Sequence, residues 1–299
     1  MKAWLYRDFK YWFTGWFLLL LLSLFVYVYN NEFGVILLRF VGTMVIALLT
    51  AMAAFDHMDT NERKKLAREQ YLNYSALIVS LDERYQNIIC FRETYKDLFN
   101  QDRFLRGLQP PFFLVRGVSE PPNMSKFNFL KRHYNDSIES DIDSYQSSVF
   151  NTPHLSKLFS DFDYLVQLID RRNEIHDTKI CKALDLNYSG GGQTHLRRDE
   201  LHKLGIPYAE LTRFLMLSEQ IMKLTDELYH CYRNAIDELS EHAKTVLDSE
   251  VAKENSGYPA IHYKFKNDHS FYVELSQEQM SMMDERDYYS RKDYTQRFF

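Results

Sequence analysis

Two long apolar runs near the N-terminus constrain this chain more than any other feature. Residues 11–29 contain no formal charge, and residues 35–55 contain only Arg39. A helix rises about 1.5 Å per residue, so each run is about 30 Å long, which matches the hydrocarbon thickness of a bilayer. The sequence therefore predicts two membrane-spanning helices, joined by a short polar loop at residues 30–34.

Basic residues flank the two runs on one side, whereas the loop between them carries only Glu32. Positive charge is retained on the cytoplasmic side of a membrane, so both ends of this hairpin are expected in the cytoplasm. The flanking basic residues are Lys2, Arg7, Lys10, Arg63, Lys64, Lys65 and Arg68. We expect a two-span protein of the bacterial inner membrane. The first run is followed by a second apolar run and not by a small-residue cleavage site. We therefore interpret the first run as a retained membrane anchor rather than a signal peptide.

The second run contains a ridge of small residues, Thr43, Ala47 and Ala51, at intervals of four. Such ridges let helices approach closely in lipid. The ridge either packs against the first run of the same chain or contributes to self-association. Arg39 lies about one turn inside the outer end of the run, where its side chain either reaches the headgroups or lines a pore.

The composition of the whole chain limits its possible functions. The 299 residues carry a net charge of −5, which argues against sequence-independent binding of nucleic acid as the main activity. Three widely spaced cysteines suit a reducing compartment and offer no disulfide framework. No cofactor motif is present, and neither a cofactor nor a metal is expected.

The fold class expected from the pattern is mainly α: a transmembrane hairpin, then a mostly helical cytosolic domain with a small C-terminal β-hairpin. A new helix is expected to begin at residues 59–62, an acidic capping sequence, and to run to about residue 100. Helices are also expected at 152–181 and 207–251, with the latter antiparallel to the helix at 60–100. The expected order is a hairpin at 1–59, a stalk or first domain helix at 60–106, an irregular Pro-rich segment at 107–151, a helical domain at 152–256, and a β-hairpin with an aromatic, charged tail at 257–299.

Two short strand candidates complete this layout. Residues 112–115 lie between proline pairs and form an apolar run that could be a short strand. In residues 260–275 apolar and polar residues alternate on either side of a turn sequence, which predicts the β-hairpin.

The best catalytic candidate is the pair Arg171 and His176. Residues 170–177 resemble the Arg-xxxx-His motif of HEPN-type ribonucleases, in which the Arg and the His act on RNA. Here Arg172 occupies the position where that motif favours a small polar residue, and helical spacing places Arg172 rather than Arg171 beside His176. The alternative is a structural polar cluster, with Glu174 or Asp177 pairing the arginines.

Two further groups of residues suggest contacts with a partner. Arg197 and Arg198 lie in a basic cluster that we interpret as a protein or nucleic-acid contact. Phe298 and Phe299 end an aromatic, charged tail that either docks on a partner or packs on its own domain. His195, Asp199 and His202 share a helical face but lack a tight pair of zinc ligands.

The whole layout resembles the two-transmembrane effectors encoded with retrons and abortive-infection proteins of the same architecture. The resemblance implies an antiviral toxin that senses infection through a cytosolic partner, such as a reverse transcriptase with its bound DNA–RNA hybrid, and then damages the inner membrane. It also implies self-association and no small-molecule substrate. The alternatives are a membrane-tethered HEPN-like ribonuclease and a passive membrane adapter.

Overall fold

The computed structural model describes residues 2–29, 31–96, 103–108, 110, 112–131, 148–183, 205–263 and 272. These residues are mainly helical and contain no strand. The chain divides into two compact units, Met1–Arg68 and Glu69–Phe299.

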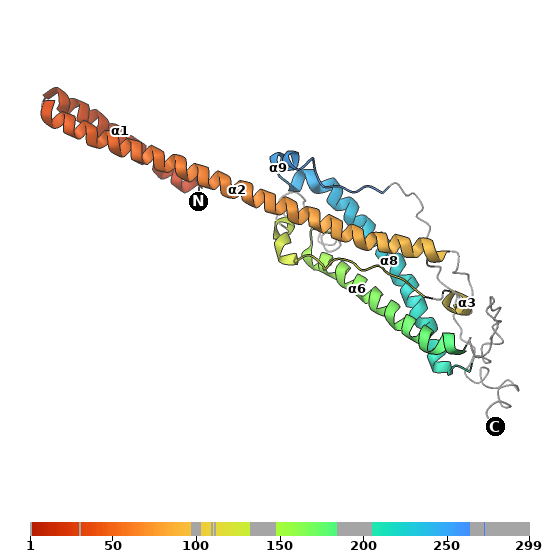
Figure 1. The fold of residues 1–299 in the computed structure, drawn as a ribbon. Helices are drawn as coiled ribbons and strands as arrows, with labels where there is room; N and C mark the ends of the chain where they lie inside the picture. The colour runs from red at the N-terminus through yellow and green to blue at the C-terminus, as the bar shows by residue number, and fades with distance from the viewer. Residues whose placement is uncertain are drawn as a thin grey trace. The chain divides into compact units, whose positions relative to one another are not determined.

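The first unit contains α1 (Lys2–Tyr29) and the first part of α2 (Asn31–Tyr95). In Figure 1, α1 folds back along α2. The two backbones meet at Gly34, where a Cβ would lie 2.2 Å from the Cα of Tyr27, so no larger residue fits without a shift. Ser23 of α1 and Val41 of α2 are buried. That both helices cross a membrane stays a prediction.

By length and composition, α2 could cross a membrane. Its most apolar stretch has a mean hydropathy of 2.3, and only 6% of that stretch is buried in the molecule. The apolar part of α1, Phe17–Tyr29, is shorter.

The expected helix start at residues 59–62 is wrong, because α2 continues without interruption through this sequence to Tyr95. The Thr60 hydroxyl donates to the Asp56 carbonyl at 2.7 Å, one turn back, instead of capping a new helix. No glycine or proline occurs between Gly42 and Gly107, so nothing in the sequence forces the helix to end.

The second unit is built on three helices: residues 69–95 of α2, α6 (Thr152–Ile175) and α8 (Tyr208–Val246). Tyr74 donates to the Leu239 carbonyl at 2.6 Å, and Arg92 pairs with Asp226 at 3.2 Å. As residue numbers increase along α2, the residue numbers of the bonded partners in α8 decrease. The two helices are therefore antiparallel, as predicted from the sequence.

Helix α6 has Pro153 in its first turn and packs against α8. It runs antiparallel to α8, in the same direction as α2. The Tyr232 hydroxyl donates to the Leu158 carbonyl at 3.0 Å, inside the core. The buried apolar stripe of α6 consists of Leu155, Leu158, Phe159, Phe162, Leu165, Leu168 and Ile169, which are the residues expected from helical spacing.

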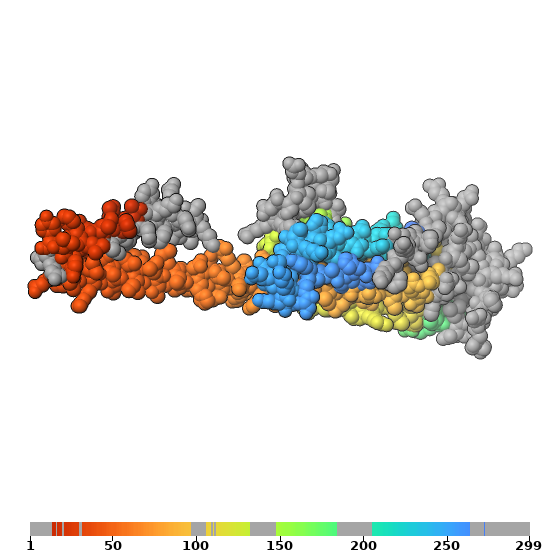
Figure 2. All heavy atoms as spheres, turned by 90° about the horizontal axis from the view of Figure 1, so that it is seen from above, coloured from red at the N-terminus to blue at the C-terminus, as the bar shows by residue number. Residues whose placement is uncertain are grey.

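Short elements close the bundle at its ends. They are α3 (Arg103–Leu108), η2 (Met124–Phe127), the π-helix η3 (His176–Cys181) and α9 (Ser249–Glu254). The hydroxyl of Tyr71 in α2 donates to the Gly257 carbonyl at 2.9 Å, just after α9. Figure 2 shows this C-terminal segment lying along α2.

Neither strand prediction is confirmed. Residues 112–123 form an irregular segment that pairs with side chains rather than with a strand. The Asn173 side chain makes two hydrogen bonds with the backbone of Phe113, at 3.0 and 2.8 Å, which replace those of a β-ladder. Of the expected β-hairpin, residues 260–263 and 272 contain no strand, and the others lie outside the described residues.

Candidate functional site

The chain changes helical form where α6 meets η3, at the sequence singled out as a catalytic candidate. Residues 176–181 take the wider π-helical form. Such π-turns are rare and occur often at functional sites. Polar side chains of α6 and η3 near this turn lie in two places: a buried cluster and a surface pocket.

Arg172 is the centre of the buried cluster and is fully enclosed. Its Nε donates to the Ser218 hydroxyl of α8 at 3.2 Å, and one terminal nitrogen donates to the carbonyl of Gly107 at 3.1 Å. The guanidinium also lies over the rings of Phe113 and Phe214, at 4.1 and 4.6 Å from their centroids. It therefore joins α6, α8 and the segment after α3.

Burial lowers the pKa of Arg172 to about 9, which still leaves the group charged at neutral pH. A buried charge is tolerated only when hydrogen bonds and nearby dipoles replace its hydration. The carbonyls and aromatic faces around Arg172 do this, which gives the cluster a structural role.

His176 lies near the Arg172 charge and is also buried, with 5% of its surface exposed. Its ring packs edge-on against Phe112, with centroids 5.0 Å apart, and its Nδ1 lies 3.3 Å from the Cys181 sulfur. Burial and the Arg172 charge lower the pKa of His176 to about 4, so the imidazole is neutral at pH 7. A neutral ring in this apolar setting is suited to packing rather than to proton transfer with a solvent-borne substrate.

Arg171 lies on a different face of α6, where it lines a surface pocket of about 250 Å³. The complete lining is Arg171, Glu174, Ile175, Thr178, Lys179, Glu210 and Arg213. Lys179 of η3 pairs with Glu210 of α8 across it at 3.4 Å. The pocket brings together charged side chains of both signs from α6, η3 and α8.

The structure thus separates the two residues of the ribonuclease hypothesis. Arg171 lines the pocket and His176 lies in the buried cluster, while Arg172 is the neighbour of His176, as helical spacing predicted. A catalytic role for Arg171 and His176 stays a prediction that this arrangement does not favour.

The other predicted sites have different outcomes. Thr43, Ala47 and Ala51 are exposed on α2 within the first unit. Arg197, Arg198, Phe298 and Phe299 lie outside the described residues, as do His195, Asp199 and His202. Within the described ranges, no group of three or more potential metal ligands comes together.

Besides Arg172, three buried arginines hold the second unit together, and sequence reasoning missed them: Arg84, Arg92 and Arg106. Arg84 lies over Phe159 and donates to the Ser119 carbonyl at 2.8 Å. A signal was present, because Arg84 lies between Leu81 and Ile88 in the apolar stripe of α2. A basic residue within such a stripe indicates a buried and partnered charge.

Comparison of the chain with family models, curated proteins and solved structures gives no match.

Proposed function

We propose that the chain is a membrane effector of anti-phage defence, which disrupts or depolarises the bacterial inner membrane when a cytosolic partner signals infection. The observation that carries this proposal is the surface of the first part of α2. Large apolar side chains such as Ile36, Ile46 and Phe55 are 66–70% exposed there. Contact of these side chains with lipid has no free-energy cost, whereas their exposure to water is unfavourable.

The proposed topology has two spans, with both termini in the cytoplasm. The close approach at Gly34 supports a tight hairpin whose connection leaves no room for an external domain. The basic residues at both inner ends support the orientation. Infection would then be sensed by the second unit.

The position of the small-residue ridge supports association between hairpins. Gly34 and Val41 mark the side of α2 that faces α1. Thr43 follows Gly34 by nine residues, about two and a half turns, so it lies on the opposite side of the helix. Ala47 also projects away from α1 and is exposed. Ala51 follows Gly34 by 17 residues, so it lies about 100° round the helix from Gly34, at the flank of this face. Of the two roles predicted for the ridge, the placement of Thr43 and Ala47 favours self-association.

The hydroxyls near the ridge need no partner from another chain. Thr43 donates to the Arg39 carbonyl at 2.7 Å, and Thr50 donates to the Ile46 carbonyl at 2.8 Å. A second helix can therefore pack against this face without leaving a hydroxyl unpaired in lipid. In the proposed mechanism, release of a partner, such as a reverse transcriptase with its DNA–RNA hybrid, lets the hairpins associate and damage the bilayer.

The test is membrane potential, followed with a voltage-sensitive dye in bacteria that express the full chain. Expression should depolarise the membrane, and the double variant A47L/A51L should abolish depolarisation without loss of insertion. A53L is the matched control, because Ala53 is an exposed alanine to one side of the ridge. Unchanged depolarisation by A47L/A51L would remove the ridge from the mechanism. Growth arrest with a polarised membrane and degraded RNA would instead support the ribonuclease alternative.

A further inference from the structure

We propose that the pocket beside η3 binds a small phosphate-bearing ligand of the mononucleotide class. This proposal does not depend on the membrane activity proposed above. It rests on three features of the pocket: its cations, an unpaired acceptor and its size.

Two arginines from different helices meet at this pocket. Arg171 extends from α6 and Arg213 from α8. Neither side chain has a hydrogen-bond or ion-pair partner among the described residues, although the chain as a whole is acidic. Two guanidinium groups around one concave site are the arrangement that binds phosphate, because each presents a fork of donors to its oxygens.

A bare inorganic anion would not account for the acidic part of the lining. One carboxylate oxygen of Glu210, Oε1, pairs with Lys179 at 3.4 Å. The other oxygen, Oε2, is buried and receives no hydrogen bond from the described residues. A buried acceptor left unpaired is unfavourable, so a ligand that fits the pocket should bring a donor to Glu210 as well as an anion to the arginines.

A nucleotide supplies both groups, since its phosphate is anionic and its sugar and base carry hydroxyl and amino donors. Glu174 places a second carboxylate in the lining for such donors. The volume of about 250 Å³ is slightly below the usual range for ligand pockets, about 300–1,000 Å³, which suits a small ligand rather than a polymer.

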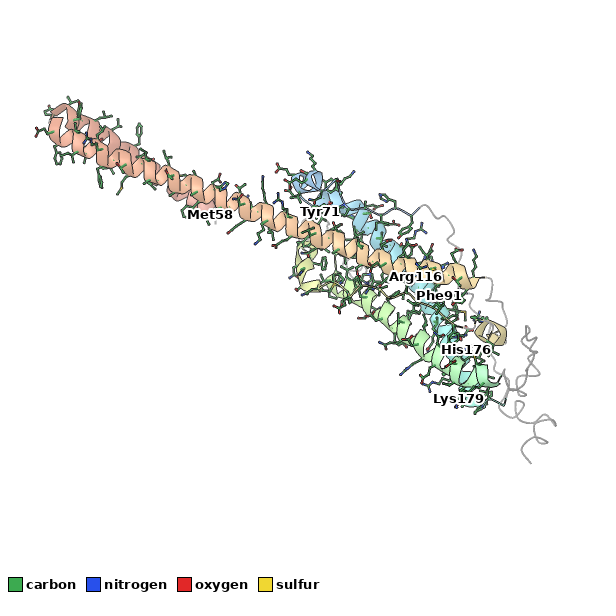
Figure 3. All side chains as sticks on the ribbon, viewed as in Figure 1. Met58, Tyr71, Phe91, Arg116, His176 and Lys179 are labelled. Atoms are coloured by element: carbon green, nitrogen blue, oxygen red, sulfur yellow. The ribbon has the colours of Figure 1, made fainter. Side chains whose placement is uncertain are left out.

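The π-helical turn contributes two residues to the site. Thr178 and Lys179 of η3 form part of the lining, and the Thr178 hydroxyl donates to the Glu174 carbonyl at 2.7 Å. In Figure 3, His176 and Lys179 lie close together where η3 follows α6. The irregular turn therefore supplies side chains to the pocket, which agrees with the frequent placement of π-turns at binding sites.

The test is calorimetric titration of the detergent-solubilised full chain with adenosine monophosphate, inorganic phosphate and adenosine. Adenosine monophosphate should bind more tightly than phosphate, and adenosine should not bind detectably. R171Q and R213Q should each weaken binding of the nucleotide by about tenfold or more. R116Q is the matched control, because Arg116 is an exposed arginine of the same unit outside the pocket (Figure 3). Melting temperatures verify that every variant folds.

A variant of Glu210 tests the binding of phosphate separately from the binding of the nucleotide. E210Q removes a negative charge and a strong acceptor, so it should bind phosphate as well as or better than the unaltered chain and bind the nucleotide less well. An unchanged ratio of the two affinities would overturn the assignment of a nucleotide. Absence of binding at millimolar phosphate and nucleotide, or equal weakening by R116Q, would overturn the anion site. Tighter, arginine-dependent binding of a short RNA oligomer would overturn the choice of a small ligand.

Discussion

Arg106 and Glu219 form a buried ion pair between two segments that are 113 residues apart in the chain. The Nε of Arg106 donates to Oε1 of Glu219 at 2.6 Å, and a terminal nitrogen donates to Oε2. Only 2% and 9% of the two side chains are exposed. This pair joins α3 to α8, next to Gly107, where a Cβ would lie 2.5 Å from a methyl of Leu215.

We expect Glu219→Ala to destabilise the second unit by about 3–5 kcal/mol, because it leaves the Arg106 charge buried without its partner. The double variant R106M/E219L removes both charges and should be considerably more stable than E219A. Urea unfolding of the full chain, followed by circular dichroism, measures both. Equal losses for the single and double variants would show that the burial of charge is not the cause.

Stability should fall as the pH is lowered from about 6.5 to about 4. Burial and Arg172 lower the pKa of His176 from 6.5 to about 4, so in this window the unfolded chain binds a proton that the folded chain does not. The contribution of His176 is about 1–3 kcal/mol. Burial also lowers the pKa of His154, which acts in the same direction.

Thermal unfolding at a series of pH values tests this dependence. His176→Phe keeps a ring between Phe112 and Phe214 and should reduce the slope between pH 6.5 and 4. His230→Gln, at an exposed histidine, should leave the slope unchanged. A slope that His176→Phe does not alter would assign the pH dependence to other groups.

Replacing Asn173 should loosen the segment that follows α3. Its side chain binds both the N–H and the carbonyl of Phe113. Asn87 makes one hydrogen bond to this segment, from the N–H of Arg116 at 2.9 Å, and its amide donates to the Glu83 carbonyl within α2. Asn173→Ala should therefore cost about 1–3 kcal/mol and Asn87→Ala less. Hydrogen exchange at residues 112–119 measures the effect directly. Equal exchange in the two variants would contradict the proposed difference.

Membrane insertion should depend on the first part of α2 and not on the part beyond it. Leu49 and Leu66 are each 56% exposed, but Leu49 lies within the apolar stretch and Leu66 follows Arg63, Lys64 and Lys65. Arginine near the centre of a span costs about 2.5–3.5 kcal/mol, so Leu49→Arg should increase the fraction released by alkaline extraction of membranes. Leu66→Arg should remain in the pellet. Identical behaviour of the two variants would contradict the assignment of the span.

Periodicity predicted the helices well where one face is apolar over many turns. Residues 152–181 and 207–251 were expected to be helical, and α6 with η3 and α8 occupy nearly these ranges. The change to a π-helix at His176 was not predictable, because both helical forms place apolar residues at similar intervals. The expected start at residues 59–62 failed because a capping sequence does not interrupt a helix that lacks a glycine or a proline.

The candidate site was predicted in part. Helical spacing correctly placed Arg172 beside His176, because residues four apart share a face. The pocket could not be predicted, since Glu210 and Arg213 come from α8 and meet Arg171 only after the bundle has formed. The backbone partners of Arg172 were also inaccessible to sequence reasoning, because the carbonyls of Gly107 and Pro110 leave no pattern of residue types.

The irregular segment between α3 and η2 has a consequence for how the second unit opens. Its carbonyls at Pro110 and Ser119 accept hydrogen bonds from Arg172 and Arg84, two cations enclosed by the helices. If the segment detached, both charges would lose hydrogen-bond acceptors at the same time while the helices still enclosed them. Local fraying is therefore disfavoured, and a loop that looks peripheral belongs to the same cooperative unit as the bundle core.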